Sequence, residues 1–149
     1  MSDFPADFDV ADFLPYLLAQ AAEATSRRFS RVYRDRHGML RTEWRVLFHL
    51  GRFGEMTAGA ISARAMIEKS KVSRAVARLA DGGMVAAAAD SADRRRAILS
   101  LTARGLEVFA ELEREAAAFE AELRARLGPD DVAALKRSLR SLWSAYADR

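Results

Sequence analysis

The chain has 149 residues, of which half are apolar and 30% are charged, and this is the composition of an ordinary globular protein with a core. It has no cysteine, which excludes disulfides, thiol redox switches and cysteine-ligated metals. The longest uncharged run near the amino terminus, residues 13–22, is too short to cross a bilayer, and the acidic start lacks the features of a signal peptide. We therefore expect a cytoplasmic protein with no membrane partner.

Charge is distributed unevenly along the chain. The net charge is +3, but residues 41–105 hold twelve Lys or Arg against six Asp or Glu, while the flanking segments are acidic overall. A basic middle between acidic ends indicates that one region contacts a polyanion. An uneven surface covered with salt bridges would give the same distribution, so charge alone does not decide between the two.

The amino-terminal part predicts a long amphipathic helix. Residues 1–11 form an acidic arm, and Asp12 is a suitable cap for a helix over residues 12–36. Apolar side chains recur near helical spacing along it, and His37-Gly38 ends it.

The middle of the chain predicts three shorter helices and a hairpin. Thr42 and Thr57 are suitable caps for helices over residues 43–53 and 58–64, and a further helix covers residues 69–81 with Val72, Val76 and Leu79 as its core face. Two glycines then precede strands over residues 84–89 and 97–101, although four successive alanines in the first strand would also suit a helix.

The carboxyl-terminal part predicts two more helices. Thr102 is placed to cap a long helix ending near residue 127, and Gly128-Pro129 separates it from a last helix over residues 130–146. The fold class is therefore mainly α with a small β-hairpin, in one domain over residues 1–149.

Only residues 65–68 separate the third and fourth predicted helices, which is the spacing of a helix-turn-helix. Arginine can bind guanine through two hydrogen bonds in the major groove, while serine and lysine hold phosphates. A solvated basic helix face would look similar. The outward face of the fourth helix carries Ser70, Lys71, Ser73, Arg74 and Arg78.

The predicted hairpin carries a second basic cluster directly after this helix. Arg94, Arg95 and Arg96 lie at its tip beside Asp93. An arginine at such a tip can enter a narrow minor groove, and a neighbouring carboxylate can pair with a guanidinium and hold the shape of the loop. The helix and the hairpin together offer contacts to two grooves of a DNA duplex.

Five fragments in this order make the sequence resemble the MarR family of bacterial regulators. They are Leu-Arg-Thr-Glu-Trp-Arg-Val-Leu at 40–47, Ile-Glu-Lys-Ser-Lys-Val-Ser-Arg at 67–74, Leu-Ala-Asp-Gly-Gly-Met-Val at 79–85, Asp-Arg-Arg at 93–95 and Leu-Thr-Ala-Arg-Gly at 101–105. The resemblance extends over residues 12–147. It implies a winged helix-turn-helix lobe over residues 41–101 and a homodimer held by helices in residues 12–37 and 102–147.

The resemblance also implies a function. The chain would be a transcriptional regulator that binds a pseudo-palindromic operator in double-stranded DNA, with Ser70, Lys71, Ser73, Arg74, Arg78, Asp93, Arg94 and Arg95 at the interface. It would be a repressor released by a small, often aromatic, effector. Two departures from the family pattern bear on this: alanines at 86–89 stand where relatives usually carry a basic residue, and Ala65-Met66-Ile67 stands where a glycine is common.

Two further groups of side chains are candidates for binding. Apolar stripes on the first predicted helix and on the last two exceed what one small lobe can cover, which indicates a dimer interface. Aromatic side chains near the family's effector position suggest a ligand site, although aromatics at helical spacing are more often core. The interface candidates are Phe13, Leu14, Leu17, Leu135, Leu139, Leu142 and Trp143, and the effector candidates are Phe29, Tyr33, His37, Trp44 and Phe48.

The sequence gives little support to other classes of function. The two histidines are twelve residues apart, which matches no metal-ligand motif, and no nucleophile-elbow or phosphate-loop pattern occurs. We therefore predict no metal, no cofactor and no enzymatic activity. The alternative is a winged helix that binds another protein without specific DNA binding.

Overall fold

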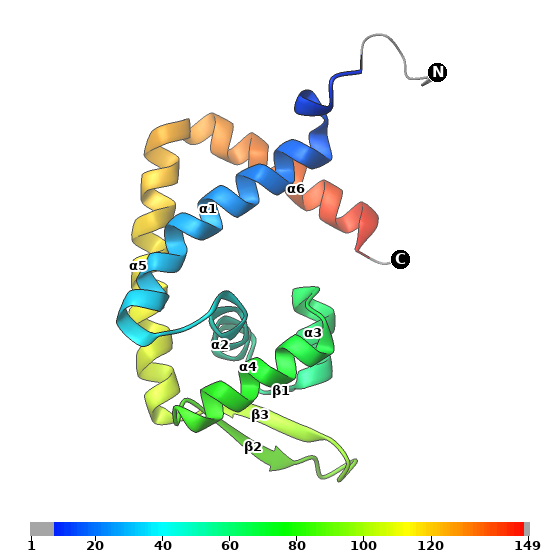
Figure 1. Cartoon of the computed structure of the whole chain (residues 1–149), viewed down its shortest axis with the longest axis vertical. Helices are drawn as coiled ribbons and strands as arrows, with labels where there is room; N and C mark the ends of the chain where they lie inside the picture. The colour runs from blue at the N-terminus through cyan, green and yellow to red at the C-terminus, as the bar shows by residue number, and fades with distance from the viewer. Residues whose placement is uncertain (1–7, 148–149) are drawn as a thin grey trace. The chain divides into compact units, whose positions relative to one another are not determined.

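The computed structural model describes residues 8–147 and confirms a mainly helical fold with a small antiparallel sheet (Figure 1). The elements in chain order are the 3-10 helix η1 (Val10–Asp12), α1 (Leu14–His37), α2 (Arg41–Phe53), β1 (Met56–Thr57), α3 (Ala58–Ala65), α4 (Lys69–Asp81), β2 (Val85–Ala89), β3 (Ala97–Leu101), α5 (Ala103–Leu127) and α6 (Pro129–Tyr146). Most of the predicted acidic arm, residues 1–7, lies outside the described residues. No helix within residues 8–147 is long and apolar enough to span a membrane.

The chain divides into two compact units after Ala110. The first unit contains everything from η1 to the first turns of α5, and the second contains the rest of α5 and α6. Within the second unit, Glu120 of α5 pairs with Arg124 one turn further along and with Lys136 of α6. The pair between Glu120 and Lys136 connects the two helices across the Gly128-Pro129 break.

The sheet has the strand order β1-β3-β2, and both pairings are antiparallel. The predicted hairpin is confirmed: Val85 faces Leu101 and Ala89 faces Ala97, with the charged loop between them. We refer to this hairpin, residues 85–101, as the wing. The two-residue strand β1, which the sequence did not predict, pairs Met56 with Leu99.

The core of the first unit lies around α2, which packs against α4 and β3. On α4 the buried positions are Val72, Ala75 and Leu79, whereas Val76, predicted in the core, is half-exposed. Ala75 takes the buried place because spacings of three and four residues keep one face of a helix inward. The most deeply buried large side chains of this unit are Tyr33, Val46, Leu47, Ile61, Val72 and Leu79.

Two of the predicted helix caps are confirmed and two are wrong. The hydroxyl of Thr57 accepts from the amide of Ala60 at 3.1 Å, and the hydroxyl of Thr102 accepts from the amide of Gly105 at 3.0 Å. Asp12 does not cap α1, because the chain makes the separate turn η1 before α1 begins at Leu14.

Helix α2 begins at Arg41, two residues before its predicted start, so Thr42 lies inside the helix. Its N-cap is Leu40, whose amide donates to the carboxylate of Glu43 at 2.5 Å. A glutamate at the third helical position satisfies an amide that would otherwise lack a partner, so no hydroxyl cap is needed.

Glycine is required where α5 leaves the sheet. A Cβ on Gly105 would lie 2.1 Å from the backbone oxygen of Met84. The same junction is fastened by Thr102, whose hydroxyl donates to the backbone oxygen of Gly83 at 2.6 Å. The base of the wing is therefore fixed to the start of α5.

Candidate nucleic-acid interface and ligand cleft

Helix α4 presents a polar face opposite its buried side. Ser70, Lys71, Ser73 and Arg74 are all exposed, and the buried positions of α4 point the other way, into the core. The ammonium of Lys71 is 4.0 Å from the carboxylate of Glu68, a distance at which solvent screens most of the attraction. These four side chains are therefore available to a partner in solution.

Arg78, the fifth residue predicted on this face, has a partner within the protein. Its Nε lies 2.5 Å from Oε1 of Glu43 in α2. The Arg78 side chain is 60% exposed, whereas that of Glu43 is only 5% exposed. Because the second oxygen of Glu43 accepts from Leu40, one buried carboxylate connects the start of α2 to α4. Helix α4 is the second helix of the helix-turn-helix, and we refer to it as the recognition helix.

The turn between α3 and α4 has an uncommon backbone conformation. Met66 has φ 54° and ψ 45°, the left-handed region that glycine adopts most easily. Four contacts hold the turn. Ser62 donates its hydroxyl to the oxygen of Ile67 at 2.6 Å, and the backbone oxygen of Ser62 accepts from the amide of Met66 and, at 3.1 Å, from the amide of Ile67. Arg45 of α2 donates to the oxygen of Ala65 at 2.5 Å. The turn therefore depends on a residue outside the helix-turn-helix.

The tip of the wing is folded around two aspartates. Asp93 Oδ1 accepts from the amide of Arg95 at 3.1 Å and from its guanidinium at 3.3 Å, and the amide of Arg96 donates to the backbone oxygen of Asp93 at 3.0 Å. Asp90 accepts from the amide of Ala92 at 3.0 Å. The Arg95 side chain is 92% exposed, so its ion pair with Asp93 orients it without holding it firmly.

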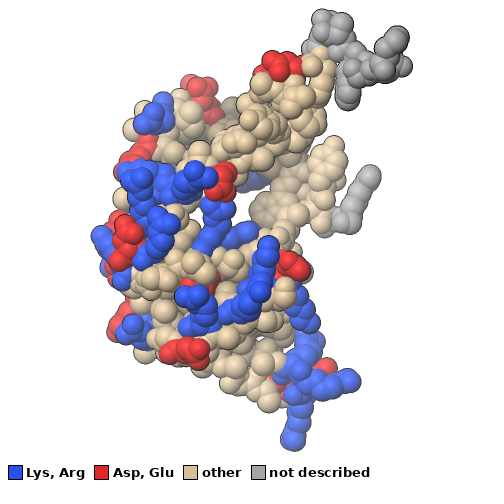
Figure 2. Space-filling model, in the orientation of Figure 1, with Lys and Arg blue, Asp and Glu red and all other residues tan. Residues whose placement is uncertain are grey.

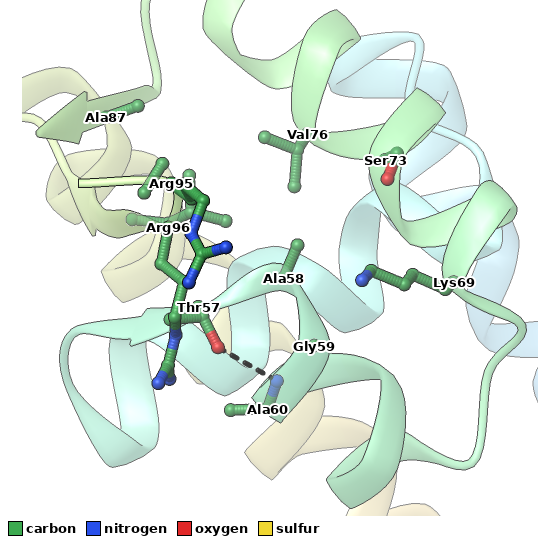
Figure 3. A pocket seen from close by; sticks show the side chains of 12 residues that line it. Thr57, Ala58, Gly59, Ala60, Lys69, Ser73, Val76, Ala87, Arg95 and Arg96 are labelled. Atoms are coloured by element: carbon green, nitrogen blue, oxygen red, sulfur yellow. Dashed lines mark hydrogen bonds between the residues drawn. The ribbon is translucent and has the colours of Figure 1, made fainter. Parts of the chain in front are cut away.

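A cleft of about 730 Å³ separates the wing from α3 and α4 (Figure 3). Lys69 and Ser73 line it from α4, and Arg95 and Arg96 approach from the wing side. Val76, which was predicted in the core, also lines this cleft. Figure 2 shows Lys and Arg side chains gathered at the tip of the wing. The cleft therefore has one lysine on the α4 side and two arginines on the wing side, an arrangement that suits the phosphate backbone between two grooves.

A second cleft, of about 420 Å³, lies between α1 and α2. Three of the predicted effector residues, Phe29, Tyr33 and Trp44, line it. Their rings are mutually in contact: Tyr33 stacks on Trp44 with centroids 5.9 Å apart, and Phe29 lies 5.5 Å from Trp44. We refer to this cavity as the aromatic cleft.

The other two predicted effector residues lie outside the aromatic cleft. Phe48 contacts Trp44 with centroids 5.7 Å apart and continues the series of rings to His49 and Phe53, but it does not line the cleft. His37 lies at the end of α1 and does not line the cleft.

Charged side chains complete the aromatic cleft, and the sequence analysis missed them. They are Glu23, Arg41 and Arg45, and Ser26 lines the wall beside them. The available signal was the spacing of Arg41, Trp44 and Arg45. Residues three and four positions apart share one face of a helix, so both arginines lie near Trp44. Spacing alone could not show that this face borders a cavity.

The cations of the aromatic cleft differ in their electrostatics. Arg41 pairs with Glu23 at 3.0 Å, and hydrogen bonds from Arg41 and Arg27 lower the pKa of the Glu23 carboxyl. Burial raises the pKa of the Tyr33 hydroxyl. Burial, and secondarily the charge of Arg41, lowers the pKa of the Arg45 guanidinium. Among the described residues, no carboxylate lies within ion-pair distance of Arg45.

The predicted interface residues are exposed within each unit. These are Phe13 at the N-cap of α1, Leu14 and Leu17 on α1, and Leu135, Leu139 and Trp143 on α6, with Leu142 half-exposed. Large apolar side chains on one helix face are unusual in a surface that stays in water. Within residues 8–147, no group of three His, Asp or Glu side chains is arranged to hold a metal ion.

The geometry defines a winged helix-turn-helix protein, and comparison with known proteins identifies its family. The family model described as MarR family matches residues 37–96. A MarR family transcriptional regulator from Silicibacter pomeroyi DSS-3 is 30% identical over 93% of this chain and 98% of its own, with a TM-score of 0.80. The chain therefore belongs to the MarR family of transcriptional regulators.

Two other solved structures are similar over almost their full length. Another MarR family transcriptional regulator from Silicibacter pomeroyi is 27% identical, with coverage of 99% and 100% and a TM-score of 0.82. The BpsR protein of Bordetella bronchiseptica, whose DNA binding is regulated by 6-hydroxynicotinic acid, is 20% identical, with coverage of 91% and 96% and a TM-score of 0.79. At that identity the likeness concerns the fold alone. A search of curated proteins by sequence finds no match.

Proposed function

We propose that the protein is a homodimeric, sequence-specific double-stranded DNA-binding repressor whose operator is pseudo-palindromic. The observation that carries the proposal is the basic cleft between α4 and the wing, with Lys69 on one side and Arg95 and Arg96 on the other. In this arrangement α4 enters a major groove, where Arg74 contacts a base, and the wing tip reaches the adjacent minor groove. The membership of the MarR family supports the same arrangement.

The dimer follows from the exposed apolar faces of α1 and α6, on which the interface candidates lie. A two-fold dimer places its two recognition helices on half-sites about one helical turn, roughly 10 base pairs, apart. Light scattering at micromolar concentration tests this part of the proposal. A folded protein with the 16.5 kDa mass of one chain would contradict it.

DNA selection followed by fluorescence anisotropy tests the main proposal. If each protomer neutralises about four phosphates, the logarithm of affinity should fall with the logarithm of salt concentration with a slope of about −7. Asp93→Ala should weaken binding although it removes a negative charge, because the bond from Asp93 to the amide of Arg95 shapes the wing tip. Selection that recovers no common motif would favour the alternative, a winged helix that binds another protein.

We also propose that a small aromatic effector releases the protein from DNA by occupying the aromatic cleft. The stacked rings of Tyr33 and Trp44 suit a planar ligand, and the arginines beside them suit an anionic substituent. The regulation of BpsR by an aromatic acid supports the proposal. Adding aromatic acids to the protein–operator complex should lower its anisotropy saturably. Release that is equal for acids and simple salts would contradict it.

A further inference from the structure

We propose that Arg45 is the residue that transmits occupancy of the aromatic cleft to the recognition helix. The inference rests on the proposed effector function of that cleft. It assigns to one side chain two roles that compete: anchoring the helix-turn-helix turn in the free protein, and binding the anionic group of an effector.

The first role is visible in the hydrogen bond from the Arg45 guanidinium to the backbone oxygen of Ala65, at 2.5 Å. Ala65 is the last residue of α3, and its carbonyl lies directly before Met66, which has the left-handed conformation. A non-glycine residue persists in that conformation only where its surroundings hold it. The bond from Arg45 therefore helps to fix the turn, and the turn sets the direction in which α4 leaves α3.

The second role follows from the place of Arg45 on the wall of the aromatic cleft. Arg41, the other arginine there, is already paired with Glu23, whereas Arg45 has only a neutral carbonyl as its hydrogen-bond acceptor among the described residues. A half-buried guanidinium without a counter-charge gains more from a carboxylate than from a carbonyl, because the carboxylate supplies the opposite charge and can accept two parallel hydrogen bonds. An anionic group in the cleft would therefore compete successfully for Arg45.

The competition couples the two sites. When Arg45 turns toward a bound anion, the oxygen of Ala65 loses a donor and the conformation of Met66 loses one of its four supports. The recognition helix is then held less firmly to α3. By linkage, DNA that requires the ordered turn opposes effector binding by the same factor.

The decisive experiment compares Arg45→Met with Arg52→Met in the full chain. Methionine keeps most of the apolar stem at position 45 but cannot donate to Ala65, and Arg52 is an exposed arginine on the same helix away from both clefts. Arg45→Met should bind its selected operator about tenfold more weakly. It should also speed amide hydrogen exchange at Met66 and Ile67 about tenfold, measured by NMR. Arg52→Met should change either quantity by a factor of about two at most.

The exchange measurement needs no DNA, so failure of the inference is distinguishable from failure of the proposed DNA-binding function. If the Arg45→Met protein exchanges its amide hydrogens at Met66 and Ile67 at the same rate as the wild type, the inference is overturned, whatever the protein binds. If the variant instead shifts the whole spectrum toward an unfolded protein, the wild type with benzoate decides.

Benzoate is a suitable probe because it has one planar ring and one carboxylate, and benzyl alcohol is its neutral counterpart. Benzoate should perturb the indole resonance of Trp44 with a dissociation constant of about 1 mM or below and should accelerate exchange at Ile67. Benzyl alcohol at the same concentration should leave exchange unchanged. No saturable effect of benzoate, or saturation of Trp44 without faster exchange at Ile67, would overturn the inference.

Discussion

Glu43 provides the sharpest test of how the recognition helix is held in place. Its carboxylate is 5% exposed and serves two elements, because one oxygen accepts from the amide of Leu40 and the other lies 2.5 Å from Nε of Arg78. Glu43→Ala removes both contacts. This single change therefore loosens the start of α2 and its connection to α4 together.

The expected magnitude follows from three contributions. Loss of the cap contact costs about 1 kcal/mol. The ion pair contributes about 1.5 kcal/mol, more than an exposed pair but well below a fully buried one, because Arg78 is 60% exposed and solvent screens it. Lost packing of the methylenes adds about 0.5 kcal/mol. Glu43→Ala should therefore lower the free energy of unfolding by about 3 kcal/mol, a large part of the stability of a small domain.

A double-mutant cycle with Arg78→Met isolates the pair. Arg78→Met alone should cost about 1.5 kcal/mol, because it leaves a buried carboxylate without its cation. The double variant should cost about 3 kcal/mol rather than the sum, which gives a coupling of about 1.5 kcal/mol. Urea unfolding at one fixed protein concentration measures all three variants, since dimerisation makes stability depend on concentration.

Two results would refute this account. A coupling below about 0.5 kcal/mol would show that the pair is an incidental surface contact. Full stability of Arg78→Met combined with loss of base preference at the operator would show that Arg78 contacts DNA and that its contact with Glu43 does not position α4.

Three further predictions concern the wing, the recognition helix and the junction between them. Arg95→Ala should weaken operator binding more than Arg96→Ala, and most on A·T-rich flanks where the minor groove is narrow; equal losses on A·T-flanked and G·C-flanked duplexes would reduce the wing to a diffuse basic patch. Arg74→Ala should cost about 1–3 kcal/mol of binding and relax base preference in repeated DNA selection, and an unchanged selected motif would exclude a base contact by Arg74. Gly105→Ala should destabilise the fold by at least 2 to 3 kcal/mol, a loss of several degrees in Tm, because its Cβ would meet the backbone oxygen of Met84; a Tm within one degree of the wild type would contradict the packing at this junction.

Local sequence signals predicted the elements well where the relevant interaction is itself local. The helix over residues 69–81 begins and ends where predicted, because its periodicity and the two following glycines lie within the element. Thr57 and Thr102 cap their helices for the same reason. Thr42 is not a cap because the carboxylate of Glu43 accepts from the amide of Leu40, so the helix already begins at Arg41.

Interactions between distant residues explain the rest. Strand β1 has only two residues and exists because Met56 lies opposite Leu99, a partner 43 positions away. The pairing of Arg78 with Glu43 was not predicted, because Glu43 lies outside the sequence of α4. The charged wall of the aromatic cleft was missed in the same way, since Glu23 and Arg41 come together only when α1 folds onto α2.

The run of alanines in β2 has a consequence for how the protein would search DNA. The strand lies at the edge of the sheet, and its alanine side chains are exposed, so backbone hydrogen bonds to β3 are its principal support. Alanine is a poor strand former, and segments with few buried contacts open at low energetic cost. We expect the wing to fluctuate while the protein slides along non-specific sequence and to become ordered only at the operator. Formation of the stable operator complex would then be slower than the first contact with DNA. The heat capacity change of operator binding would be larger in magnitude than for a protein with a rigid hairpin.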